Sequence, residues 1–142
     1  MRIFLARLFS ACALLIWLPL AGAQANEADR QAIQSVIRAQ LEAFQRDDGN
    51  TAFSFAAPVI QQKFGDPGRF LTMVKRGYDP VYRPTATEFR EIELQDGWGR
   101  QAVLFVDREG VAWMAHYSME RQADGRWRIA GVRLERLAEL SA

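Results

Sequence analysis

The stretch from Val111 to Leu134 constrains the fold most, because it predicts two antiparallel strands joined at residues 123–125. Aromatic and β-branched residues dominate both arms of this stretch. The Asp-Gly pair at its centre is typical of a hairpin turn. A long hairpin of this kind needs further strands or helices to cover its apolar face, so the rest of the chain is expected to pack on it.

The charges of the two arms decide between two registers. A two-residue turn would set Arg121 opposite Arg128, whereas a three-residue loop with Gly125 in the left-handed conformation sets Glu120 opposite Arg128. Facing opposite charges stabilise a strand pair by roughly a few tenths of a kcal/mol, and facing like charges destabilise it by about as much. We therefore predict the three-residue loop, which also sets Trp127 opposite Arg121 for guanidinium stacking.

Side-chain alternation then divides the hairpin into two faces. The face expected in the core carries Val111, Trp113, Ala115, Tyr117, Met119, Trp127 and Ile129. The opposite, half-polar face carries Ala112, Met114, His116, Ser118, Glu120 and Arg128. A bulge at Gly131 would turn Val132 and Leu134 toward the core.

Residues 1–23 are predicted to be a signal peptide. Arg2 and Arg7 make a basic start, and the apolar run Leu8–Leu20 is too short for a comfortable membrane span. Small residues allow cleavage after Ala23 or, alternatively, after Ala25. We favour cleavage over an uncleaved anchor, so the mature chain, residues 24–142, is expected to be one periplasmic or secreted domain without a stable membrane span.

Composition excludes several classes of function. Loss of two arginines with the signal peptide lowers Lys plus Arg from 18 to 16 against 17 acids, so the net charge changes from +1 to −1. Such a chain has no basic stripe and is not expected to bind nucleic acid. Its one cysteine, Cys12, leaves with the signal peptide, which excludes disulfides, a cysteine nucleophile and thiolate metal sites.

Four helical segments are predicted in the first half of the mature chain. The first begins at an Asn26 cap and ends at residues 47–49, with Gly49 at positive φ. Asn50 is expected to cap a short second helix over 51–57, and the pair Asp47-Asp48 is expected to cap that helix or to stop the first one. Proline at the first turn and a closing glycine bound the third and fourth helices, which run over 58–64 and 67–76.

The second half predicts strands. The prolines at 80 and 84 exclude a helix over Tyr78–Pro84 and favour extended backbone. A strand follows over 85–94, in which Phe89 is out of phase with Ile92 and indicates either a bulge or a switch of faces. A turn at 96–99 leads to the apolar central strand 101–106. Helices followed by an antiparallel meander predict an α+β fold, with the helices packed on one face of a curved sheet.

At this point the chain resembles the bacterial domain-of-unknown-function family 4864. The matching residues are Asp48, Ala52-Phe53, Ala57-Pro58, Ile60, Phe64, Phe70, Met73-Val74, Tyr78, Pro80–Pro84 and the run Asp124-Gly125-x-Trp127-x-Ile129-x-Gly131-Val132. That family is similar to the nuclear-transport-factor-two-like superfamily, which implies a cone of bent sheet around helices. The superfamily contains ketosteroid-isomerase-type enzymes, dehydratases and proteins that only bind, so the resemblance implies a fold and no catalytic residue.

His116 is the only histidine and could act with a carboxylate as a general base. A half-exposed position beside Met114 is the simpler interpretation. Tyr78, Asp79, Tyr82 and Arg83 could bind a polar group or supply an acid and a base at the rim of the cone. The simpler interpretation is a stiff proline-set loop whose tyrosines cover the edge of the core. A contact from Asp48 to Arg83 is a separate alternative that the sequence leaves open.

Three hypotheses for function follow. The first is a small-molecule-binding or scaffold protein of the cell envelope, with a small apolar ligand or a second subunit as partner. The second is a cofactor-free enzyme of the isomerase or dehydratase type that uses Tyr78, Asp79, Tyr82 or His116. The third is a dimerising accessory domain with an exposed apolar sheet face. No motif indicates a cofactor, and a lone histidine makes a metal site unexpected.

Overall fold

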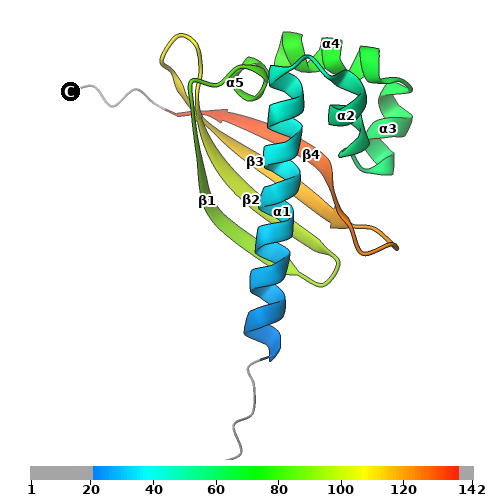
Figure 1. Cartoon of the computed structure of the whole chain (residues 1–142). Coiled ribbons are helices and arrows are strands. Elements are labelled where there is room, and N and C mark those ends of the chain that lie inside the picture. Colours follow the sequence, from blue (N-terminus) through cyan, green and yellow to red (C-terminus); the bar gives the residue numbers. More distant parts are fainter. Residues whose placement is uncertain (1–20, 138–142) are drawn as a thin grey trace, which may run out of the picture.

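The computed structural model describes residues 21–137, so most of the predicted signal peptide lies outside the described residues. The helices are α1 Ala21–Gln45, α2 Gly49–Ser54, α3 Pro58–Phe64, α4 Pro67–Gly77 and α5 Asp79–Tyr82. The strands are β1 Ala86–Gln95, β2 Trp98–Val106, β3 Ala112–Arg121 and β4 Trp127–Arg136. The long helix α1 crosses one face of the sheet, and α2, α3 and α4 gather beyond the β4 edge (Figure 1). This arrangement confirms the predicted α+β fold of helices on one face of an antiparallel sheet.

The four strands form an antiparallel sheet in the order β1-β2-β3-β4. The β3–β4 hairpin has the predicted register, with Glu120 paired to Arg128 and Arg121 paired to Trp127. Gly125 takes a φ of 84°, as the three-residue loop requires. The Arg121 guanidinium lies 4.9 Å from the Trp127 ring centroid, so the predicted stacking is present.

The bulge of β4 lies one residue before the predicted position. Ser118 pairs with Gly131 and Met119 pairs with Ile129, so Ala130 is the residue without a partner on β3. Glycine is not needed here, because a bulge residue near the right-handed helical region is open to alanine. Val132 and Leu134 pack against the core beyond the bulge, as expected.

A second bulge interrupts β1, where the register shifts between Phe89 and Ile92 as the sequence predicted. The side chain of Gln101 on β2 is completely buried beneath it. Its Nε2 donates to the carbonyl oxygens of Arg90 at 3.0 Å and Glu91 at 3.3 Å. The buried side-chain amide of Gln101 therefore donates hydrogen bonds to carbonyl oxygens that have no β-ladder partner at the bulge.

The core lies between α1 and the sheet face that α1 covers. Ile33, Ile37 and Phe44 of α1 are at most 1% exposed. Besides Gln101, the fully buried strand residues are Val103, Phe105, Ala115 and Tyr117. We call this sheet face the inner face and the opposite one the outer face. The Tyr117 hydroxyl has no hydrogen-bond partner within the described part of the chain.

The junction between α1 and α2 differs from the prediction. Asp48, not Asn50, caps α2, because its carboxylate accepts a hydrogen bond from the Thr51 backbone N–H at 3.1 Å. Gly49 is the first residue of α2, and Asp47 takes the positive φ, 54°, that the sequence assigned to glycine. Aspartate tolerates the left-handed region better than most residues, so two adjacent aspartates fulfil the roles predicted for Gly49 and Asn50.

Two other local predictions are wrong. Helix α1 begins at Ala21, so Asn26 lies inside it and caps nothing, since the alanine-rich residues before it favour helix. The segment Tyr78–Pro84 contains the short helix α5, because Pro80 occupies its first turn, where no hydrogen bond is lost. Arg83, before Pro84, leaves the helix with a φ of −140° as predicted.

The turn predicted over 96–99 is shorter in the structure. Asp96 and Gly97 form it, and β2 already begins at Trp98, which is 38% exposed on the outer face. None of the helices in residues 21–137 combines the length and apolar character of a membrane-crossing segment.

Candidate functional site

An apolar cavity of about 530 Å³ lies between α1, α3, α4 and strand β4. Its size is in the range of small-molecule sites. Most of its lining side chains are aliphatic or aromatic. The lining residues include Phe44, Ile60, Phe64, Phe70, Met73, Val74, Tyr78, Val81, Ile129 and Val132, with Gln40 and Lys63 as the polar members.

Hydrogen bonds at two places join the helix layer to β4, and the cavity lies between these two places. The chain between α2 and α3 forms a short parallel bridge with β4, in which Ala57 N–H donates to the Ile129 carbonyl at 2.8 Å. Ile129 N–H in turn donates to the Phe55 carbonyl at 2.9 Å. Further along β4, the Tyr78 hydroxyl donates to the Val132 carbonyl at 3.3 Å. The wall between them is residues 129–132, which contain the bulge at Ala130.

Phe70 on α4 forms the aromatic centre of the helix layer beside the cavity. Its ring centroid lies 5.3 Å from that of Phe53, 5.9 Å from that of Phe64 and 6.1 Å from that of Phe44. Tilted and edge-on aromatic contacts at these distances are favourable and fix the ring positions. The side of the cavity formed by Phe44, Phe64 and Phe70 is therefore preformed in the folded chain.

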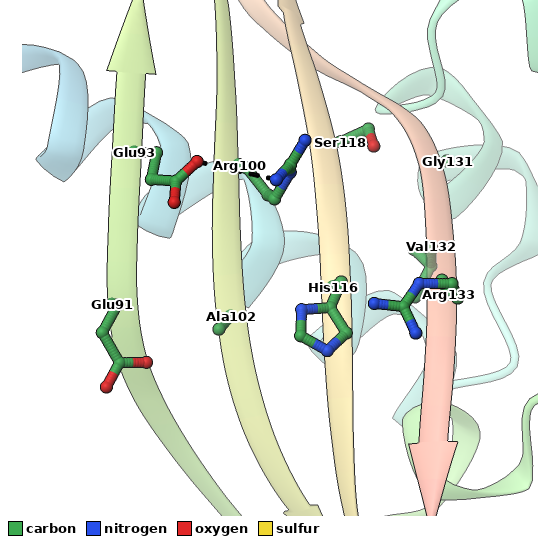
Figure 2. A pocket seen from close by; sticks show the side chains of 9 residues that line it. All are labelled: Glu91, Glu93, Arg100, Ala102, His116, Ser118, Gly131, Val132 and Arg133. Carbon is green, nitrogen blue, oxygen red and sulfur yellow. Dashed lines mark ion pairs between the residues drawn. The ribbon is translucent and has the colours of Figure 1, made fainter.

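A second hollow, which we call the outer groove, lies on the outer face of the sheet. Figure 2 shows the side chains of Glu93, Arg100 and His116 on the side of the strands turned away from α1. Its volume is about 790 Å³. It is lined by Glu91, Glu93, Arg100, Ala102, His116, Ser118, Gly131, Val132 and Arg133.

Charged pairs dominate this outer groove. His116 Nε2 lies 2.9 Å from Glu135 Oε2, and Arg100 Nη1 lies 3.6 Å from Glu93 Oε2. Figure 2 places the Arg133 guanidinium beside the His116 ring. The His116 side chain is 25% exposed, as the half-exposed interpretation predicted. Ion pairs this open to water contribute little to stability or binding.

The structure separates the predicted site residues. Tyr78 lines the apolar cavity and His116 lines the outer groove, so the sheet lies between them. Asp79 forms an ion pair with Arg108. Among the described residues that line these two hollows, Asp79, Tyr82 and Arg83 do not occur. A single catalytic cluster of these residues is therefore not formed.

Tyr82 and Arg83 have a structural role around Asp47. The Tyr82 hydroxyl donates to the Asp47 carboxylate, which lowers the pKa of Asp47, and the nearby cations Lys75 and Arg83 lower it further. Arg83 also donates to the Phe44 carbonyl at 2.5 Å. The contact expected between Arg83 and Asp48 is made by Asp47 instead, at 3.3 Å. These bonds fasten the end of α1 to α5.

The helical residues of the cavity carry no signal in the sequence beyond apolar spacing. Ile60, Phe64, Phe70 and Met73 all carry the helical spacing of buried residues. Periodicity cannot distinguish a side chain that packs tightly from one that lines a cavity. Lys63 carried no signal, because a lysine in the last turn of a helix is common.

Two further features of the described residues bear on dimerisation and on metal binding. Val103 and Phe105 are fully buried on the inner face, which removes them from the exposed apolar sheet face that a dimerising domain would need. Within residues 21–137, no group of three or more histidine, aspartate, glutamate or cysteine side chains is placed to hold a metal ion.

The fold is similar to that of a solved NTF-2-like protein. A crystal structure of an NTF-2-like protein of unknown function from Silicibacter pomeroyi DSS-3 is similar at a TM-score of 0.56 and 13% identity. The match covers 79% of this chain and 98% of that one. A DUF4783 family protein from Bacteroides ovatus ATCC 8483 matches at a TM-score of 0.50 and 10% identity, over 71% of this chain and 94% of the other.

The sequence family is more specific than the fold. The profile of the domain of unknown function DUF4864 matches residues 26–142, and the chain belongs to this family. No curated protein matches the chain. The resemblance found in the sequence is thus confirmed for both the family and the fold.

Proposed function

We propose that this protein binds a small apolar molecule in the cavity beside β4, after export to the cell envelope. The observation that carries the proposal is the cavity itself, with its largely apolar lining and its size of about 530 Å³. Apolar hollows that are partly enclosed and preformed are the usual sites for small ligands. Transfer of apolar surface from water into such a hollow supplies the driving force.

The second support is the way the cavity is built. Its walls belong to α1, α3, α4, α5 and β4. The helix layer is joined to β4 by backbone hydrogen bonds at Ile129 and by the bond from the Tyr78 hydroxyl to the Val132 carbonyl. A hollow framed in this way costs the chain little reordering when a ligand enters. Preformed sites lose less free energy to ordering on binding than flexible ones.

Export is supported by the sequence at the N-terminus. A basic start, an apolar run and the small residues before Gln24 and Asn26 have the order of a secretory signal. The DUF4864 match begins at residue 26, directly after the alternative cleavage position at Ala25 and two residues beyond the one expected after Ala23. Intact mass spectrometry of the protein purified from the envelope fraction tests this part. A mature chain that begins at Gln24 or Asn26 supports it, and an uncleaved chain found in the cytoplasm contradicts it.

Binding is tested by titration of the mature protein with N-phenyl-1-naphthylamine, a neutral apolar probe that fluoresces when it leaves water. We expect saturable binding by the wild type. Ile60→Trp places a larger ring in the cavity and should weaken binding roughly tenfold or more, which corresponds to a loss of about 1.4 kcal/mol. Native mass spectrometry of the same preparation checks for a retained small molecule.

Val59→Trp is the matched control, because Val59 precedes Ile60 on α3 but is 57% exposed to solvent. It adds the same side chain outside the cavity and should leave the affinity unchanged. Equal effects of the two variants would place the probe elsewhere on the surface. Failure of the folded wild type to bind the probe at all would overturn the proposed function.

A further inference from the structure

The lining of the apolar cavity contains one charged side chain among the residues that the structure describes, and it is a cation. Lys63 stands in the last turn of α3 and is exposed, so it marks the mouth of the cavity and not its floor. Its Nζ lies 5.5 Å from the centroid of the Phe64 ring, which also lines the cavity. The ammonium group thus lies over an aromatic ring beside the opening.

The polar groups deeper in the cavity are already bonded within the protein. Gln40 Nε2 donates to the Ala52 carbonyl at 3.0 Å, and the Tyr78 hydroxyl donates to the Val132 carbonyl. The Ile129 carbonyl accepts from Ala57 N–H. A ligand that entered with its polar end first would have to break these bonds or leave its own polar group unsatisfied, which is costly in an apolar site.

Lys63 differs from Lys75, the other lysine of the chain, because Lys75 has a carboxylate partner. Lys75 Nζ lies 3.7 Å from Asp47 Oδ1 and near Arg83, in the cluster that fastens α1 to α5. Within the described part of the chain, Lys63 takes part in no ion pair. No carboxylate lines the cavity over the same residues. The electrostatic field at the opening therefore favours an anion over a cation.

These features together set the direction and the charge of the ligand. Resting on the proposed function, we propose that the ligand is an anionic amphiphile: an apolar tail in the cavity and a carboxylate at its mouth, beside Lys63. The tail occupies the space between Phe70, Met73 and Val132, and the carboxylate stays partly in water. Such an arrangement buries no unpaired charge and needs no rearrangement of the bonded polar groups.

Three probes with one tail and different heads test the inference: dodecanoate, dodecan-1-ol and dodecylamine, each below its micelle-forming concentration and near neutral pH. Displacement of N-phenyl-1-naphthylamine reports their affinities. We expect the wild type to bind dodecanoate roughly three- to fivefold more tightly than the alcohol, as a partly exposed ion pair allows, and the ammonium most weakly. Added salt should reduce this preference, because it screens exposed charges.

Variants of Lys63 isolate the effect of its charge. Lys63→Gln should bind dodecanoate and dodecan-1-ol equally, whereas Lys63→Arg should keep the preference for the acid. Lys63→Glu should reverse the order of acid and amine. Arg76→Gln is the control, because Arg76 is an exposed cation on α4 that does not line the cavity and its loss changes the net charge equally.

The outcomes separate this inference from the proposed function. If the wild type binds all three probes equally, or if Lys63→Gln keeps the preference for dodecanoate, the carboxylate assignment is overturned while apolar binding stands. If the folded wild type binds neither the neutral alcohol nor the acid, both the inference and the proposed function fail.

Discussion

The apolar cavity and the outer groove share residues 131 and 132 of β4 and otherwise have opposite character. The cavity is covered by helices, its polar groups are paired within the protein, and Lys63 is its one charged residue among those described. The outer groove is larger but more polar, with His116 paired to Glu135 and Arg100 paired to Glu93. The apolar character of the lining, and not volume, decides which hollow can hold an apolar molecule, because removal of apolar surface from water supplies the driving force.

The largest expected effect is a difference in stability between alanine variants of two neighbouring β2 residues, one on each face of the sheet. Phe105→Ala should lower the free energy of unfolding by about 3–5 kcal/mol, because Phe105 is completely buried on the inner face. Leu104→Ala removes an apolar residue that is only half-buried on the outer face and should cost about 1 kcal/mol. Urea unfolding of both variants measures the difference. Equal losses would mean that the outer face is also covered, as in a dimer.

Gln101 and Arg100 allow the same comparison of the inner and outer faces for polar residues. Gln101→Ala should lower the free energy of unfolding by about 1–3 kcal/mol, because the carbonyls of Arg90 and Glu91 lose their buried donor. Arg100→Ala, the neighbouring change on the outer face, should stay within about 0.5 kcal/mol of the wild type. Chemical denaturation measures both. A stable Gln101→Ala variant would show that the β1 bulge can find other donors.

Tyr117 is the counterpart of Gln101, a buried polar residue whose hydroxyl has no partner in the described chain. Tyr117→Phe removes this group and should raise the free energy of unfolding by about 1 kcal/mol, as loss of an unsatisfied buried polar group does. The melting temperature reports the change. A lower melting temperature would indicate a hydrogen bond through an internal water molecule.

The same variant tests a dependence on pH. Burial raises the pKa of the Tyr117 phenol well above its ordinary value of 10.0. The unfolded chain then loses this proton near pH 10 while the native chain keeps it, so stability falls as the pH rises above 10. Tyr117→Phe should lose less stability than the wild type between neutral and strongly alkaline pH.

The smallest effect is expected in the outer groove. His116→Gln breaks the pair with Glu135 but should change the free energy of unfolding by less than about 0.5 kcal/mol, because that pair is open to water. It should also leave binding in the apolar cavity unchanged. A large loss of affinity in this variant would show that the two hollows are coupled through β4.

Local sequence signals predicted the sheet better than the helix junctions. The hairpin register follows from facing charges at Glu120 and Arg128, and the β1 bulge follows from the phase of Phe89, because both depend on neighbours within one strand pair. Asp47 and Asp48 were expected to stop the first helix or to cap the next, but which residue does which was left open, because tertiary contacts decide between two adjacent aspartates. Here the tertiary contact is the hydrogen bond that Tyr82, which is distant in the sequence, donates to Asp47.

The candidate site could be predicted only in part. The sequence identified Tyr78 and the aromatic core residues. It also predicted a partly exposed His116, which the structure shows. The cavity itself depends on how far α3 and α4 stand from β4, which the bridge at Ala57 and the bond from Tyr78 determine. Such spacing is a property of the assembled fold, and hydrophobic periodicity carries no information about it.

The bridge between Ala56 and Ile129 has one further consequence, for behaviour at high concentration. β4 is an outer strand of the sheet, and its exposed backbone groups could pair with a strand of another molecule. The chain between α2 and α3 uses the N–H and the carbonyl of Ile129 itself. The contact that frames the cavity therefore also blocks edge-to-edge aggregation at this position, so loosening it would be expected to promote fibre formation.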